Sequence, residues 1–110
     1  MRLIVAAAFL LAGCAREPTA ADRGRLLLQQ FGCGQCHSIP GVANARGTSG
    51  PPLAGVRERA YLGGVAPNTP GNMARWIRDP RRFDPRTTMP AMGVTEAQAA
   101  DMVAYLMDAR

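Results

Sequence analysis

Cys33-Gly34-Gln35-Cys36-His37 is the stretch of sequence that decides the fold. On a helical turn, residues three positions apart share a face, so the sulfurs of Cys33 and Cys36 point to the same side. His37 follows directly and is the only histidine in the chain. This spacing is the attachment signature of a c-type haem, in which both sulfurs form thioethers to one edge of the porphyrin and the adjacent imidazole ligates the iron. The stretch therefore predicts one covalently bound haem.

Two other uses of a close cysteine pair fit the sequence less well. A thiol redox site of the thioredoxin type lies on a strand-to-helix turn, and the chain shows no βαβ pattern. A structural zinc site takes four Cys or His ligands, and beyond the motif only Cys14 remains. Haem attachment is therefore the interpretation that we favour.

The length and composition fit a single small domain packed around a ligand. The chain has 110 residues, of which 47% are hydrophobic and only 5% aromatic, with 12 glycines and 9 prolines. One hydrophobic core is feasible at this length, but frequent Gly and Pro predict that turns and loops occupy much of the chain. A bound haem would add the apolar mass that this core lacks.

The chain is basic, with a net charge of +5, and all 13 basic residues are arginines. It has no basic stretch interleaved with aromatic residues and no nucleic-acid reader motif, so we expect no nucleic-acid partner. Five arginines cluster in one segment: Arg75, Arg78, Arg81, Arg82 and Arg86. They predict a docking surface for an acidic redox protein, and a solvated helix face is the alternative.

The N-terminus has the pattern of an export signal. Arg2 is followed by an uninterrupted apolar run over residues 3–12. This run is too short for a transmembrane helix, which needs roughly 20 apolar residues. It ends in Leu11-Ala12-Gly13-Cys14, which resembles the bacterial lipoprotein signal, in which the cysteine is lipidated and becomes the mature N-terminus.

We therefore expect residues 1–13 to be a lipoprotein-type signal, residues 14–21 a tether and residues 22–110 the folded domain. A lipid on Cys14 would hold the domain on the periplasmic side of a bacterial membrane. It would also explain the odd thiol, because exported chains seldom carry a stray reactive cysteine. Two alternatives stay open: cleavage near Ala20-Ala21, and an uncleaved segment with an incidental cysteine.

The domain begins with a predicted helix. Asp22 is a plausible N-cap. Leu26, Leu27 and Phe31, with Leu28 beside them, follow as an apolar stripe, and the helix should run into the cysteine pair. Residues 38–68 contain too many Gly and Pro residues for a long helix and no alternating run for a strand, so they predict a long loop.

Two more helices are predicted toward the C-terminus. Thr69-Pro70 is an N-cap followed by proline at the first helical position, and Asp79-Pro80 ends that helix. A loop from Arg81 to Val94 follows. Thr95 and Gln98 form a capping box, which starts a last helix from about Glu96 to about Asp108. Three or four short helices with long Gly/Pro loops and no strands predict an all-α domain wrapped around a ligand.

The run from Asn72 to Pro90 resembles the distal segment of class I cytochromes c. In that family an apolar helix ends at a proline, and a second proline and a threonine precede the axial methionine. The resemblance covers roughly residues 22–110 and implies the cytochrome c fold, with Met89 as the second axial ligand of the iron. Met92 is the alternative ligand, although a loop methionine is usually a gap-filler.

The resemblance implies roles for four further residues. Gly50-Pro51-Pro52-Leu53 is similar to the family's loop in which a proline carbonyl, here that of Pro51, accepts a hydrogen bond from the proximal histidine and fixes its tautomer. Arg59 and Thr87 occupy positions where the family contacts a haem propionate. Trp76 occupies the position of an aromatic ring against the distal haem face. A solvated Arg59 and a Trp76 that belongs only to the core are the alternatives.

The resemblance also places Gly24 where the first helix crosses the last one. Compared with the best-known members, this chain has one additional residue between Gly24 and Cys33, which leaves the residue at the crossing open.

A histidine and a thioether fill both axial positions, so the iron keeps no open position for oxygen or a substrate, and methionine raises the reduction potential. The sequence shows no second histidine, no general base in an evident pocket and no phosphate-binding loop, so none of these features indicates catalysis. We therefore expect a membrane-tethered carrier of single electrons between redox proteins, with no small-molecule substrate. The alternatives are a haem-bearing subunit of a larger membrane oxidoreductase, and a sensor or enzyme whose Met89 ligand is displaceable.

Overall fold

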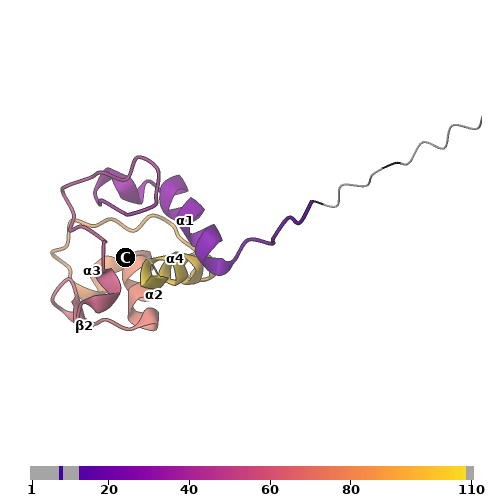
Figure 1. The fold of residues 1–110 in the computed structure, drawn as a ribbon. Helices are drawn as coiled ribbons and strands as arrows, with labels where there is room; N and C mark the ends of the chain where they lie inside the picture. Colours follow the sequence, from indigo (N-terminus) through magenta and orange to yellow (C-terminus); the bar gives the residue numbers. More distant parts are fainter. Residues whose placement is uncertain (1–7, 9–12, 109–110) are drawn as a thin grey trace, which may run out of the picture.

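Four α-helices are joined by loops, two 3₁₀ turns and a short hairpin in the computed structural model, which describes residue 8 and residues 13–108 (Figure 1). In chain order the elements are α1 (Ala20–Gln30), η1 (Cys33–Gln35), η2 (Val56–Glu58), β1 (Tyr61–Leu62), β2 (Ala66–Pro67), α2 (Pro70–Arg78), α3 (Pro80–Phe83) and α4 (Glu96–Asp108). The predicted all-α architecture is confirmed, with the hairpin as an addition. None of the helices in the described part of the chain is long and apolar enough to cross a membrane. The predicted signal, residues 1–13, lies outside the described residues except for Ala8 and Gly13.

Helix α1 begins earlier than the sequence suggested. Its N-cap is Thr19, whose hydroxyl oxygen accepts from the Asp22 amide at 3.1 Å, while the Thr19 amide donates to the Asp22 carboxylate at 2.8 Å. Asp22 is therefore the third helical residue of a capping box, and its prediction as the N-cap is wrong because Thr19 supplies a better-placed oxygen. The helix also stops before the cysteines, since Gly32 has a φ of 70°, in the left-handed region.

Two short elements depart from the predicted loops. Leu62 pairs with Ala66 in an antiparallel hairpin whose strands have only two residues each, too short for an alternating pattern to be visible in the sequence. Helix α3, Pro80–Phe83, occupies the start of the predicted loop, because Asp79-Pro80 ends α2 and also begins a new helical turn.

Helices α1 and α4 cross at very short distance. A Cβ atom on Gly24 would lie 1.9 Å from the Asp101 carbonyl oxygen, so only glycine fits at this point of α1. Beside it the Arg23 guanidinium donates two hydrogen bonds to the Asp101 carboxylate, at 2.9 and 3.1 Å. Gly24 is therefore the residue at the helix crossing, as the resemblance implied.

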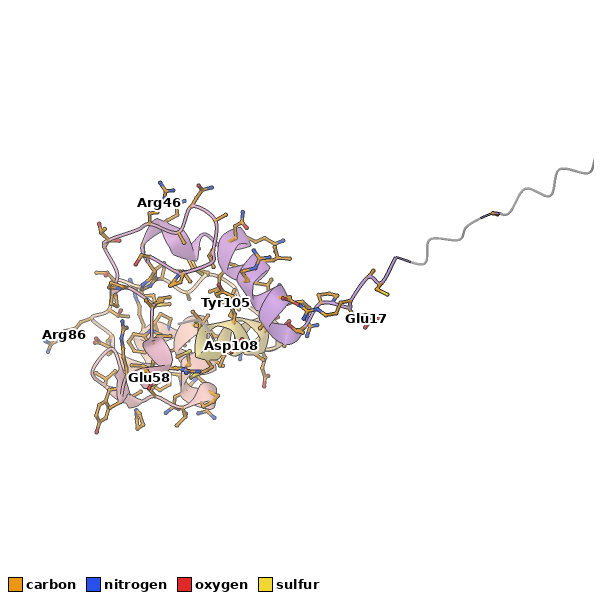
Figure 2. All side chains as sticks on the ribbon, viewed as in Figure 1. Glu17, Arg46, Glu58, Arg86, Tyr105 and Asp108 are labelled. Carbon is orange, nitrogen blue, oxygen red and sulfur yellow. The ribbon has the colours of Figure 1, made fainter. Side chains whose placement is uncertain are left out.

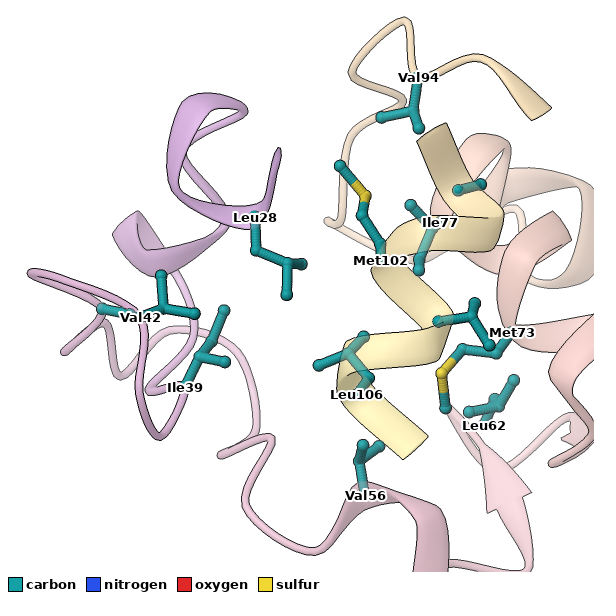
Figure 3. Close-up of a cluster of buried hydrophobic side chains, with 13 residues drawn as sticks. Leu28, Ile39, Val42, Val56, Leu62, Met73, Ile77, Val94, Met102 and Leu106 are labelled. Atoms are coloured by element: carbon teal, nitrogen blue, oxygen red, sulfur yellow. The ribbon is translucent and has the colours of Figure 1, made fainter. Parts of the chain in front are cut away.

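The core is built around α4, which contacts both α1 and α2. Thr95 and Gln98 form the predicted capping box, with hydrogen bonds of 2.9 and 3.1 Å. Four α4 side chains are buried, as their spacing predicts: Ala99, Met102, Val103 and Leu106. Figure 3 shows Leu28 of α1 facing Met102 from one side, and Met73 and Ile77 of α2 on the other.

Candidate haem site

The two motif cysteines lie on η1, directly after the end of α1. The His37 amide donates to the Cys33 carbonyl at 3.0 Å, which closes the turn and places the imidazole beside the cysteine pair. Both thiols are free. Cys33 packs against the core, and burial raises the pKa of its thiol, whereas Cys36 is exposed. The turn thus presents one sulfur at the apolar interior and one at the surface.

A loop from residues 44–50 lies directly against the backbone of this turn. The Gly47 amide donates to the Gly34 carbonyl at 3.0 Å, and the Gly50 amide donates to the Cys36 carbonyl at 2.7 Å. A Cβ on Gly34 would lie 2.5 Å from the Ala45 Cα, and one on Gly47 would lie 2.4 Å from the Cys36 carbonyl carbon. Glycine at these positions lets two backbone segments touch, so the loop holds the motif in a fixed shape.

His37 is oriented by a single hydrogen bond. Its Nδ1 atom lies 2.7 Å from the Pro51 carbonyl oxygen, which can only accept, so Nδ1 carries the proton. The other ring nitrogen, Nε2, then keeps its lone pair, the state in which a histidine binds a metal. Gly50 forms the surface behind the ring, since a Cβ there would lie 2.5 Å from the His37 Cε1 atom. The expected contact with Pro51 is thus present.

Met89 lies in a turn of the segment between α3 and α4. Its amide donates to the Thr87 hydroxyl oxygen at 3.2 Å, and the Thr87 amide donates to the Asp84 carbonyl at 3.1 Å. The Met89 side chain is half-buried, whereas Met92 is 46% exposed. The difference in burial favours Met89 as the methionine that faces a group held inside the fold.

Arg59 and Trp76 both make contacts within the fold. The Arg59 guanidinium donates to the Pro52 carbonyl, one residue after the carbonyl that orients His37. Trp76 packs against the core, and its ring centroid lies 5.9 Å from that of Phe83. Arg59 is therefore tied to the histidine-bearing loop and not simply solvated, and Trp76 has the packing of a core residue.

Asn68 is a site residue that the sequence did not reveal. Its side-chain nitrogen donates to the carbonyls of Val56 and Arg59, both at 2.9 Å, and so clamps the turn η2 that leads to Arg59. Its Oδ1 atom is buried and has no partner among the described residues. Asn68 lies in a Gly/Pro-rich loop, where nothing in the local sequence distinguishes a clamping asparagine from a turn residue.

The geometry fits a covalently attached haem. Two free thiols three residues apart suit covalent attachment of a porphyrin, and the adjacent imidazole keeps one nitrogen for its iron. The sequence model of the family described as cytochrome c matches residues 21–110. The chain belongs to the cytochrome c family.

This membership identifies residues 21–110 as a cytochrome c domain, the haem-binding domain of that family. A curated relative is the "Cytochrome c oxidase subunit 2" of Alkalihalophilus pseudofirmus, which is 32% identical over 93 residues. That stretch covers 82% of this chain but only 26% of the relative, so the chain spans about a quarter of the length of the curated protein that it matches.

Proposed function

We propose that this cytochrome c carries single electrons through one haem, held by thioethers to Cys33 and Cys36 and ligated by His37 and Met89. The observation that carries this proposal is the 2.7 Å contact between the His37 Nδ1 atom and the Pro51 carbonyl. It directs the imidazole so that Nε2 is the ligating nitrogen and keeps the ring from rotating. The haem supplies an iron that gains or loses one electron without bond making.

The other residues support this site from within the fold. Pro51 keeps the imidazole in one tautomer, and Thr87 orders the turn that carries Met89. Arg59 is half-buried and anchored to the Pro52 carbonyl by one nitrogen, which leaves further N–H groups for a propionate. Trp76, which packs against Phe83 and the core, occupies the position where the family has an aromatic ring against the distal haem face.

An absorption spectrum of the purified protein tests the ligand set. A methionine-to-iron charge-transfer band in the oxidised protein is expected, and it should be lost in Met89→Ala and kept in Met92→Ala. Loss of the band in Met92→Ala alone would overturn the assignment of Met89. Rapid binding of carbon monoxide to the reduced wild-type protein would instead support a sensor or enzyme with a displaceable ligand.

We also propose that residues 1–13 are an export signal, that Cys14 carries a lipid and that residues 14–18, which precede the Thr19 cap of α1, tether the domain to the periplasmic face of a bacterial membrane. Two observations support the tether. Cys14 is exposed, and its segment leads away from the helical body in Figure 1. Mass spectrometry of the mature N-terminus should find a lipidated cysteine, and Cys14→Ser should move the protein from the membrane to the soluble fraction. A mature N-terminus at Ala20-Ala21 would refute the lipid anchor.

A second candidate function is a fixed haem-bearing unit of a larger membrane oxidoreductase. It is favoured by the similarity to a cytochrome c oxidase subunit 2, a protein about four times as long as the matched stretch. Extraction with a mild detergent separates the two cases. A free carrier purifies alone, whereas a fixed subunit purifies with the oxidoreductase in constant proportion.

A further inference from the structure

The turn of the β1–β2 hairpin lies directly against the indole ring of Trp76. A Cβ atom on Gly63 would lie 2.5 Å from the Trp76 Cη2 atom and 2.9 Å from its Cζ2 atom. Both atoms belong to the outer, six-membered part of the ring. A Cβ atom on Gly64, the next residue, would meet nothing within 4 Å. Of the two glycines in the turn, Gly63 is therefore the one whose missing side chain makes room for the indole.

The hairpin is fixed to the core on both strands. Leu62 and Ala66 are paired across it and are 7% and 3% exposed. The Val65 amide donates to the Leu62 carbonyl at 3.0 Å and closes the turn. Figure 3 shows the Leu62 side chain beside Met73 of α2. A methyl group added at residue 63 would therefore meet an anchored turn on one side, so the indole ring is the group that has to move.

The base of the hairpin is connected to the loop that orients His37. The Asn68 amide donates to the Ala60 carbonyl at 3.0 Å, and the Asn68 side chain donates to the Arg59 carbonyl at 2.9 Å. The Arg59 guanidinium in turn donates to the Pro52 carbonyl. Residues 56–68 thus form one hydrogen-bonded unit that contacts the histidine loop at one point and Trp76 at another.

Two elements on the same side of the domain hold the indole ring. Figure 1 shows α3 and β2 on this side, and Figure 2 places Glu58 of η2 there too, whereas Arg46 of the loop behind the cysteine turn lies at the opposite end. Trp76 is half-buried, and its ring centroid lies 5.9 Å from that of Phe83 at an interplanar angle of 44°. The positions of Gly63 and Phe83 together fix the ring.

We propose that Gly63 is a positioning residue of the haem site, through which the hairpin sets the place of the Trp76 ring on the side of Met89. The inference rests on the proposed electron-carrier function, in which Trp76 lies against the distal haem face. A displaced ring leaves room for water on that face. Greater solvent exposure favours the oxidised iron and so lowers the reduction potential.

Gly63→Ala in the full-length, haem-loaded protein tests this role, and Gly64→Ala is the matched control. Both glycines have a positive φ, 54° and 73°, so alanine strains the backbone at either position. Only the methyl group at residue 63 also meets the ring. Trp76 is the only tryptophan of the chain, so its near-ultraviolet circular dichroism and its fluorescence lifetime, which is shortened by energy transfer to the haem, report on this ring alone.

Gly63→Ala should change both signals of Trp76 and lower the reduction potential. At a fixed applied potential, the ratio of reduced to oxidised protein should fall by about threefold, in the lower range of coupling between contacting residues. Gly64→Ala should leave the two signals and this ratio unchanged. Equal effects of the two substitutions, or no effect of Gly63→Ala, would overturn the proposal.

A double variant separates the contact with the ring from other effects of the hairpin. Trp76→Phe removes the outer ring atoms that the added methyl group would meet, so Gly63→Ala should lower the potential no further in that background. Full additivity of the two substitutions would contradict the proposal. If Gly63→Ala alone does not retain its haem, the double variant should regain it, and its failure to do so would count equally against the proposal. Failure of the electron-carrier function itself would appear in the wild type, as the absence of a haem spectrum or of the methionine-to-iron band.

Discussion

Gly24→Ala tests whether the crossing of α1 and α4 sets the stability of this cytochrome c. The added Cβ would lie 1.9 Å from the Asp101 carbonyl oxygen, 2.5 Å from its carbonyl carbon and 3.0 Å from the Met102 Cα. All three atoms belong to the α4 backbone, so no side-chain rotation relieves the clash. An ordinary carbon–oxygen contact is about 3.3 Å, so the helices must separate locally by about 1.4 Å.

That separation loosens the best-buried part of the core. Leu28 and Met102 are 2% and 0% exposed, and both lie within one or two turns of the crossing. Overpacking of this kind lowers the free energy of unfolding by about 1–3 kcal/mol and occasionally more. Replacing a helical glycine by alanine raises it by about 0.5–1 kcal/mol. We expect a net loss of about 1–2 kcal/mol in the free energy of unfolding, which lowers Tm by roughly 4–16 °C for a domain of this size.

Guanidinium unfolding of the oxidised, haem-loaded protein, followed by far-ultraviolet circular dichroism, measures the effect. Gly71→Ala is the matched control, because Gly71 lies in α2 with nothing within 4 Å of the position of its Cβ. It should be neutral or stabilising by up to about 0.5 kcal/mol. If Gly24→Ala were as stable as the wild type, with an unchanged denaturant slope, the close crossing would not be the constraint that we infer.

Three further changes test other contacts. Tyr105→Phe removes the 2.5 Å hydrogen bond from the Tyr105 hydroxyl to the carbonyl of Pro40, and the free energy of unfolding in urea should fall by about 1–2 kcal/mol; an unchanged value would contradict this. Hydrogen bonds from Arg23 hold the pKa of Asp101 below its ordinary value of 3.8, so this contribution is complete above that pH and is lost as the pH falls through the lower folded value. Acid unfolding of Asp101→Asn should therefore show a shallower loss of stability in that range, and an identical profile would refute the pair's role. Gly50→Ala pushes a methyl group against the His37 ring and should alter the haem absorption spectrum, whereas Gly71→Ala, whose Cβ meets nothing within 4 Å, should leave it unchanged.

Local sequence signals predicted the helices with good accuracy. Thr69-Pro70 and Asp79-Pro80 bound α2, and the capping box at Thr95 starts α4, because these ends depend on side chains only a few residues from the backbone groups that they satisfy. The same logic failed at α1, where the N-cap is Thr19, three residues before Asp22, the residue predicted as the N-cap. It failed again at the hairpin, whose strands are shorter than any recognisable period.

The sequence alone determined the attachment motif, since Cys33, Cys36 and His37 are neighbours on one turn and need no other part of the chain to be recognised. The tertiary structure decided what surrounds that motif. The carbonyl of Pro51 at His37, the clamp of Asn68 on the turn before Arg59 and the hydrogen bond from Tyr105 to the Pro40 carbonyl join residues from separate segments. Such contacts depend on how the loops and helices pack around α4, and packing follows from the shape of the whole chain, which no local spacing records.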